Sequence, residues 1–396
     1  MLKLLDCNNF WSPSGGGVRR YHLEKMDYFK SRSDVHYVFV MHDNRTYTEQ
    51  INDHTYVEHI EVPKVWGNWE YRYLIRKWPM SRVILEHQPD IIEVGSPYFM
   101  PRIIHSIVKK NKLQSKVFGF WHADFPVTYV RRFLKNAPLG LANKGEQLAW
   151  QYARKHYNRM EGVLVASEVV KNRMEENGMR NLHFAPLGVN NKLFHPDKRN
   201  SGLVADLKSG NPNRLILFFP HRFSKEKGLH VLLRAYEMLL EILDTPPALV
   251  LAGTGPYENL VKEAVAKYKH VHFKGFIENK KEMAEYYASS DLGFALSGWE
   301  TFGLSLVEAL SSGLPLIVAG EGAAKEHIEK SGAGLTLEKV SPECLVDAII
   351  KFTKLDPLLL KQKARDYVSD LSWKDCFDRQ LDIYQGAVAT SKTTVH

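Results

Sequence analysis

Residues 291–320 read DLGFALSGWETFGLSLVEALSSGLPLIVAG and contain two apolar runs, DLGFAL and PLIVAG, with a helical pattern between them. Strands that are buried on both faces are continuously apolar, and such strands are typical of parallel sheets covered by helices. A strand, a helix and a second strand in this order form a βαβ unit. The stretch therefore predicts one unit of an α/β domain.

The same alternation continues through both halves of the chain. A length of 396 residues predicts two domains, since a domain typically has roughly 100–200 residues. Residues 186–214 are rich in glycine, proline, asparagine and charge, and they mark the junction. We place two doubly wound α/β domains at residues 1–190 and 191–396. We expect the last helices, in the strandless segment after residue 341, to pack back on the first domain.

The composition is that of an ordinary globular protein. Hydrophobic residues make up 44% of the chain and charged residues 25%, which excludes a disordered chain. The three cysteines, Cys7, Cys344 and Cys376, are too scattered for a disulfide framework or a zinc site. No window reaches the ~20 apolar residues that span a bilayer, and the N-terminus lacks a signal-peptide pattern. We therefore expect a cytoplasmic protein, with peripheral binding to the cytoplasmic face of a membrane left open.

The net charge of +8 is confined to the first half of the chain. Residues 1–180 hold 27 basic and 19 acidic residues, whereas the remainder holds 26 of each. This asymmetry indicates that the first domain faces an anionic partner, either nucleic acid or an acidic membrane.

A glycine-rich turn, Ser14-Gly15-Gly16-Gly17, follows the first predicted strand and leads into a helix. Because Gly16 and Gly17 have no Cβ, a ligand can approach the backbone, and the helix N-terminus offers free N–H groups to an anion. The dinucleotide fingerprint G-x-G-x-x-G is incomplete, since Arg20 stands at its third glycine. The turn is either a phosphate or sugar site or a plain flexible connection.

A basic loop, HRFSKEKG, follows the first predicted strand of the second half. Arg222 and Lys227 could converge on a diphosphate, Arg222 with a planar fork of donors and Lys227 with a point charge. The alternative is an ordinary solvated basic loop.

Two glutamates, Glu300 and Glu308, flank the start of a helix that we expect near Gly303. Their carboxylates could accept hydrogen bonds from sugar and ribose hydroxyls, or they could be a cap and a surface charge. His122 ends another strand, in FWHAD, where an imidazole could orient a hydroxyl or move a proton. A structural role is the alternative for this histidine.

Several catalytic motifs are missing from the sequence. It contains no D-x-D pair, no H-E-x-x-H, no P-loop and no G-x-S-x-G. We therefore expect no metal site and no cofactor.

Taken together and in this order, the segments resemble the retaining family-4 glycosyltransferases, which have the GT-B fold of two facing Rossmann-like domains with a cleft between them. The resemblance is carried by Glu300 and Glu308 within ETFGLSLVEALSSGLP, by the Arg222 to Gly228 loop, by AGTGP at residues 252–256 and by PLGV at residues 186–189. The chain departs from the pattern at Asn190, where many relatives have aspartate, and in its basic pair Arg19 and Arg20.

The resemblance implies a nucleotide-diphospho-sugar donor held mainly by the second domain. Arg222 and Lys227 would neutralise the diphosphate as it leaves, in place of a metal ion. Glu308 would bind the ribose and Glu300 the donor sugar. The remaining implied contacts are the backbone of Phe302, Gly303 and Leu304 with sugar and phosphate oxygens, Ile277 with the nucleobase, Gly16 and Gly17 with the diphosphate and acceptor, and His122 with the transferred sugar.

Basic and aromatic stretches in the first domain are the basis for predicting the class of acceptor. Residues 64–79, KVWGNWEYRYLIRKWP, interleave basic and aromatic side chains, and a second basic stretch, residues 128–144, follows His122. Such surfaces suit an anionic membrane with a lipid-linked acceptor, a saccharide acceptor or a half-buried helix, and less well a nucleic acid. We expect a metal-independent, retaining transfer of a hexose from GDP-mannose or UDP-glucose. The alternatives are a catalytically silent sugar-nucleotide-binding protein and an NAD-dependent oxidoreductase.

Overall fold

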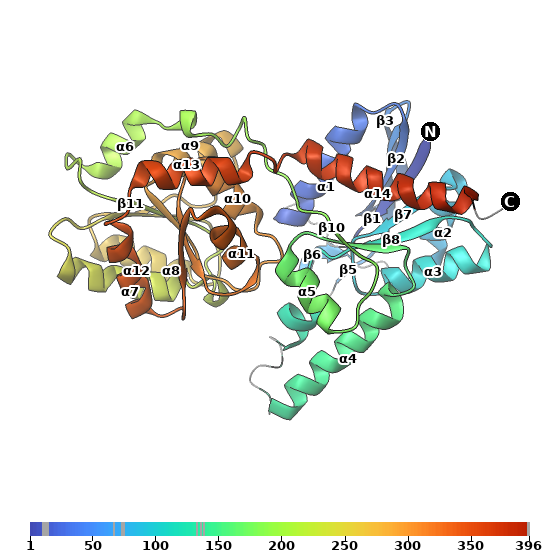
Figure 1. Cartoon of the computed structure of the whole chain (residues 1–396), viewed down its shortest axis with the longest axis horizontal. Coiled ribbons are helices and arrows are strands. Elements are labelled where there is room, and N and C mark those ends of the chain that lie inside the picture. Colours follow the sequence, from blue (N-terminus) through green and yellow to red (C-terminus); the bar gives the residue numbers. More distant parts are fainter. Residues whose placement is uncertain are drawn as a thin grey trace. The chain divides into compact units, whose positions relative to one another are not determined.

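The computed structural model of the protein describes residues 1–9, 16–65, 68–72, 76–131, 134, 137 and 139–393 (Figure 1). The chain forms two compact units. Unit 1 comprises Met1–Leu187 and Trp373–His396, and unit 2 comprises Gly188–Ser372. The sequence-based ranges 1–190 and 191–396 differ from this division in two places, because the junction lies at Leu187 and Gly188, and Trp373–His396 is part of unit 1.

Unit 1 is built on an eight-stranded sheet in the order β10-β9-β8-β7-β1-β2-β4-β3. All neighbouring strands are parallel except β3 and β4, which pair antiparallel. Its strands are β1 (Leu2–Cys7), β2 (Val35–Asp43), β3 (Tyr47–Asn52), β4 (Thr55–Glu61), β7 (Ile91–Val94), β8 (Lys116–Phe120), β9 (Gly162–Val165) and β10 (Leu182–Phe184), with a separate hairpin of β5 (Lys64–Val65) and β6 (Asn68–Arg72).

Helices connect these strands in unit 1, as the alternating pattern predicts. They are α1 (Gly17–Lys30), α2 (Lys77–His87), α3 (Met100–Lys110), the π-helical turn η1 (Pro126–Arg131), α4 (Leu139–Tyr157), α5 (Glu168–Glu176) and the terminal helix α14 (Trp373–Thr393). Helix α3 illustrates why they form, since Ile103, Ile104 and Ile107 recur at helical spacing and are buried on one face. Helix α14 packs against α1 (Figure 1).

Unit 2 has six parallel strands in the order β13-β12-β11-β14-β15-β16. The strands are β11 (Ile216–Pro220), β12 (Ala248–Ala252), β13 (Val271–Phe273), β14 (Leu292–Ala295), β15 (Leu316–Ala319) and β16 (Gly334–Leu337). This is the doubly wound order in which the connections reverse direction once, here between β11 and β14. The predicted parallel α/β fold is confirmed in both units.

The helices of unit 2 are η2 (Pro196–Lys198), α6 (Ser201–Lys208), η3 (Lys225–Lys227), α7 (Leu229–Ile242), α8 (Glu258–Lys267), α9 (Lys280–Ser289), α10 (Leu304–Ser311), α11 (Gly322–Ser331), α12 (Pro342–Phe352) and α13 (Pro357–Val368). Their starts follow local signals. Ser341 and Asp356 cap α12 and α13 through side-chain oxygens, each directly before a proline at the first helical position. Helix α12 packs against α7 and α13 against α10, so only α14 of the terminal helices belongs to unit 1.

None of the helices in the part of the chain that the structure describes is long and apolar enough to cross a lipid bilayer.

Candidate functional site

The candidate donor site lies at the carboxyl edge of the unit 2 sheet, where β11 and β14 are neighbours. Ligands of doubly wound sheets bind at this position, because loops that leave in opposite directions open a crevice there. The loop after β11 carries Arg222 and Lys227, and the loop after β14 carries Glu300. Two loops whose residues are more than 70 positions apart in sequence therefore lie side by side because of the strand order.

The two loops are joined by an ion pair. Lys227 Nζ donates to Glu300 Oε1, and both side chains are about a quarter exposed, at 25% and 27%. Burial alone would raise the pKa of the Glu300 carboxyl, but the charge and hydrogen bond of Lys227, together with His221, lower it below its usual value. Glu300 is therefore ionised at neutral pH, and an anionic ligand on Lys227 would compete with it.

A glycine turn after β12 supports the basic loop from the other side. Phe223 N donates to Thr254 O at 2.9 Å, between Gly253 and Gly255, which have φ values of +141° and +154°. A Cβ on Gly253 would lie 2.2 Å from His221 O, so only glycine fits at this approach. The turn thereby fixes the backbone that carries Arg222, whose side chain is exposed.

The loop after β14 is held in place by helix α11. Gly303, with φ +86°, is the left-handed residue that precedes α10. His327, on α11, lies with Nε2 2.8 Å from Phe302 O and with Nδ1 2.7 Å from Tyr367 Oη. Helix α10 begins at Leu304, one residue after the expected start, and directs its first N–H groups to this edge.

Glu308 and Ile277 lie in the same unit. Glu308 is 6% exposed on α10, so it is not the surface charge that the alternative reading allowed. Ile277 is buried in the loop after β13, where Gly253 N donates to Gly275 O at 2.7 Å and ties this loop to the glycine turn. The donor residues of the second half therefore all come from loops at one sheet edge or from the helix that begins there. Their roles toward a ligand stay predictions.

Two histidines near this edge, the partly buried His221 and the buried His327, have pKa values that keep them neutral at physiological pH. His221 Nε2 lies 2.6 Å from Phe294 O, and burial together with Lys227 lowers the pKa of His221 to about 4. Burial also lowers the pKa of His327 to about 4, against a smaller opposing effect of its hydrogen bond to Phe302. Sequence reasoning missed both residues, because no motif distinguishes them among the 17 histidines.

The depressed histidine pKa values predict acid sensitivity of unit 2. In the unfolded chain these imidazoles take up protons near pH 6.5, so the unfolded state binds more protons than the folded state between about pH 6.5 and 4. Stability is thus fully present above pH 6.5 and is lost as pH falls, by up to about 1.4 kcal/mol per pH unit for each histidine. Urea unfolding of wild type and His327→Gln between pH 7 and 4.5 should show a shallower decline for the variant. Equal slopes would contradict this assignment.

Unit 1 holds the remaining predicted residues. Gly16 precedes α1 and Gly17 is its first residue, while Ser14 and Gly15 lie outside the described residues. Among the described residues, no atom lies within 4 Å of a Cβ added to Gly16, so crowding by these residues does not require glycine there. His122 follows β8, and its pKa is well below the usual value because of burial, with His22 contributing.

The described part of the aromatic and basic stretch of residues 64–79 does not form the single half-buried helix that the sequence pattern allows as one alternative. It comprises the β5–β6 hairpin and the start of α2. Trp66 and Tyr73 lie outside the described residues, as do the side chains of Trp69 and Tyr71. Trp78, on α2, is 74% exposed.

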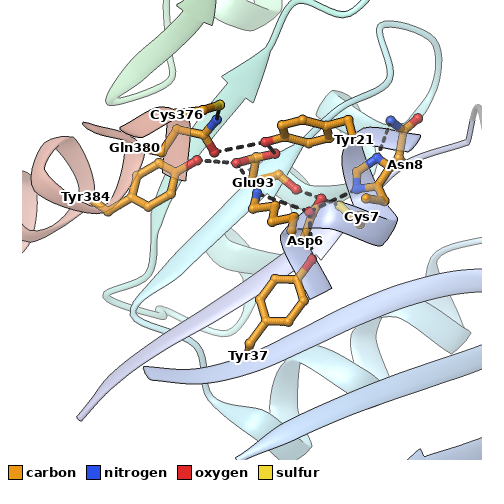
Figure 2. Close-up of polar contacts among 11 residues, drawn as sticks. Asp6, Cys7, Asn8, Tyr21, Tyr37, Glu93, Cys376, Gln380 and Tyr384 are labelled. Carbon is orange, nitrogen blue, oxygen red and sulfur yellow. Dashed lines mark hydrogen bonds and ion pairs between the residues drawn. The ribbon is translucent and has the colours of Figure 1, made fainter. Parts of the chain in front are cut away.

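A buried charged cluster in unit 1 was missed by sequence reasoning. Asp6 on β1 and Glu93 on β7, both labelled in Figure 2, are direct neighbours across the two strands. Lys25 of α1 forms an ion pair with each of the two carboxylates. All three side chains are inaccessible to solvent. The only signal in the sequence was an acidic residue inside each of two apolar runs, LKLLDC and IIEV.

Within the described residues, no group of three or more histidine, cysteine, aspartate or glutamate side chains could hold a metal ion.

Two family models match the chain, and together they extend over most of it. The model described as Glycosyltransferase Family 4 matches residues 15–193, and the model described as Glycosyl transferases group 1 matches residues 207–368.

Known proteins resemble the chain along its whole length. A GDP-mannose-dependent alpha-mannosyltransferase of Corynebacterium glutamicum is 25% identical over 391 residues, covering 96% of this chain and 88% of the relative. A GDP-mannose-dependent alpha-(1-6)-phosphatidylinositol dimannoside mannosyltransferase of Mycobacterium tuberculosis is 25% identical over 403 residues, covering 98% and 97%. The solved structure of sucrose-phosphate synthase from Thermosynechococcus elongatus matches with a TM-score of 0.77 at 16% identity, covering 98% of this chain and 100% of that one.

Proposed function

The chain belongs to the family-4 glycosyltransferases and has the GT-B fold, and we propose that it transfers mannose from GDP-mannose to a lipid-linked or saccharide acceptor. The observation that carries the donor is the near full-length similarity to two enzymes whose names specify GDP-mannose. UDP-glucose is the second candidate donor, because no described residue distinguishes the guanine of GDP-mannose from the uracil of UDP-glucose.

The geometry of unit 2 supports a donor bound along one sheet edge. In this proposal the diphosphate displaces the Glu300 carboxylate from Lys227 and also meets Arg222. The released Glu300 carboxylate then accepts hydrogen bonds from hydroxyls of the donor sugar. Glu308 binds the ribose, and the first N–H groups of α10 face the phosphate or sugar oxygens.

The proposed reaction is a displacement on one face of the sugar. The bond between the anomeric carbon and the phosphate oxygen breaks, and a bond to the acceptor oxygen forms on the same face, so the configuration is retained. The proton of the acceptor hydroxyl passes to the departing phosphate oxygen. Arg222 and Lys227 stabilise the charge that develops on the diphosphate, which makes a metal ion unnecessary. His122 orients the transferred sugar.

The acceptor proposal is supported by the surface of unit 1. Leu141, Lys144 and Leu148 form a stripe on the exposed face of α4, since their spacing of three and four residues places them on one side of a helix. Leu141 and Leu148 are 53% and 55% exposed. Apolar and basic side chains on one helix face suit the interface of an anionic membrane. We propose that the protein is cytoplasmic and binds such a membrane peripherally.

A panel of donors tests the function. Purified protein is incubated with GDP-mannose, GDP-glucose and UDP-glucose, with and without EDTA, and with phosphatidylinositol vesicles or a free mannoside as the acceptor. We expect product with GDP-mannose, no effect of EDTA and an α-linked product by NMR. GDP-glucose separates recognition of the base from recognition of the sugar.

Each part of the proposal has its own contrary outcome. A β-linked product would contradict retention, and inhibition by EDTA would contradict metal independence. Donor binding without any turnover would favour a silent sugar-nucleotide-binding protein. Failure to co-sediment with phosphatidylglycerol vesicles at low salt would remove the membrane surface from the proposal.

A further inference from the structure

The buried cluster of unit 1 connects the first strand to the terminal helix (Figure 2). Lys25 Nζ lies 3.1 Å from Asp6 Oδ2 and 2.6 Å from Glu93 Oε2. Helix α14 enters the same cluster through Tyr384, whose hydroxyl donates to Glu93 Oε2. Buried charges are costly unless they are paired and hydrogen-bonded, so each of these groups depends on the placement of the others.

Tyr21, on α1, is the second link to α14. Its hydroxyl lies 2.9 Å from Gln380 Oε1 and 3.2 Å from Glu93 Oε1, so the two acceptors share its single proton, and the shorter distance is to Gln380. The ring is fully buried, with Phe377 of α14 at a centroid distance of 5.7 Å and Trp373 at 6.5 Å. The Tyr21 hydroxyl is therefore held by the terminal helix and by Glu93, while its ring also packs against Phe120 at 4.9 Å and lies 5.2 Å from Lys25 Nζ.

The Tyr21 ring also contacts His122. The two ring centroids are 4.8 Å apart with an interplanar angle of 66°, an edge-on arrangement. The His122 ring also stacks on Phe120 at 4.1 Å and 15°, and the Phe120 ring in turn lies 4.9 Å from the Tyr21 ring. A third ring neighbour of His122 is His22 of α1, at a centroid distance of 5.6 Å. Of these three neighbours, Tyr21 is the one whose hydroxyl is hydrogen-bonded to α14, at Gln380.

A purely structural role would not require this arrangement. Tyr28, two turns further along α1, also joins α1 to α14, since its hydroxyl donates to Asp378 and its ring meets Phe377 at 5.3 Å. Tyr28 has no ring contact with His122 among those that the structure describes. Both tyrosines therefore attach α14 to α1, but of the two only Tyr21 has a described ring contact with His122.

We infer that Tyr21 is a positioning residue through which the terminal helix α14 sets the orientation of the His122 imidazole. The inference rests on the proposed function, in which His122 contacts the transferred sugar. A sugar must be placed precisely for transfer, and a small displacement of a contacting group lowers the rate more than it weakens binding.

The test compares three conservative variants. Tyr21→Phe removes the hydroxyl and keeps the ring, Gln380→Met removes its partner on α14, and Tyr28→Phe is the matched control. We expect kcat to fall about tenfold in Tyr21→Phe and Gln380→Met, with the donor KM changed by less than about twofold. Tyr28→Phe should keep kcat within about twofold of the wild-type value, even if its Tm falls as far as that of Tyr21→Phe.

A second readout follows His122 directly. The ring proton signal of His122 in an NMR spectrum is identified by its loss in His122→Gln. It should shift in Tyr21→Phe and Gln380→Met and stay unchanged in Tyr28→Phe, because an aromatic ring shifts the signals of protons at its edge.

The outcomes separate the inference from the proposed function. An unshifted His122 signal in both Tyr21→Phe and Gln380→Met would overturn the positioning role, as would a shifted signal with unchanged kcat. If wild-type protein transfers no sugar from any donor, the proposed function fails, and the His122 signal still decides whether α14 sets the imidazole. Gln380→Met keeps the test available if Tyr21→Phe does not fold.

Discussion

Lys227→Ala is expected to lower kcat by about 10²- to 10³-fold, because a fixed donor aimed at developing charge contributes most in the transition state. Lys227 is the cation of the basic loop that forms an ion pair with Glu300. Once the donor has displaced Glu300, the positive charge of Lys227 acts on the departing diphosphate. Steady-state kinetics with saturating donor measure the effect. The kcat of Arg222→Ala should also be lower than that of the wild type.

The loss of the Glu300 partner must be separated from the loss of leaving-group stabilisation. Lys227→Ala leaves a partly buried carboxylate unpaired, which by itself could disturb the site. If the ammonium acts on the diphosphate, Lys227→Ala/Glu300→Gln should stay as slow as the single variant. Recovery of kcat in the double variant would contradict the leaving-group role. Lys225→Ala is the control, since this exposed residue lies on the same loop.

Lys25→Met should destabilise unit 1 by about 3–5 kcal/mol, since it leaves two buried carboxylates without their shared cation. The Asp6 pKa is held below its usual value by Lys25 and His22 against the effect of burial, whereas burial raises the Glu93 pKa. Hydrogen exchange of peptides from β1 and β7 measures the opening of unit 1 separately from unit 2. Protection there should fall strongly.

A matched pair of variants identifies the cause. Lys30→Met, on the exposed side of the same helix, should change stability by less than about 0.5 kcal/mol. Adding Glu93→Gln to Lys25→Met removes one of the uncompensated charges and should restore part of the loss. Unchanged protection in Lys25→Met would contradict the prediction, because it would show that the cluster tolerates buried carboxylates without their shared cation.

The donor site shows how far sequence reasoning reached. The strand–loop–helix pattern around residues 291–320 placed Glu300 before a helix and Glu308 on it, and the structure has α10 at Leu304–Ser311. The glycine turn within AGTGP, residues 252–256, which the sequence indicates only as part of the family resemblance, lies at the end of β12. These features depend on neighbours a few residues apart, such as the φ values that only glycine adopts readily.

The pairing of Lys227 with Glu300 required the tertiary structure. A periodic pattern identifies strands but does not order them, and only the order β11-β14 brings these two loops together. The same holds for His327, which reaches Phe302 from a later helix, and for Gln380 and Tyr384, which reach α1 and β7 from the end of the chain.

The amino-acid order alone thus predicts the alternation of strands and helices, the mainly parallel sheets and the residues at several strand ends, because backbone preference and hydrophobic period act over short range. It did not predict β3 or the β5–β6 hairpin. The tertiary structure decides the strand order, the membership of α14 in unit 1 and the neutral or ionised state of buried groups. These depend on which distant side chains share a site of low polarity, where the interaction of one charge with another is strongest.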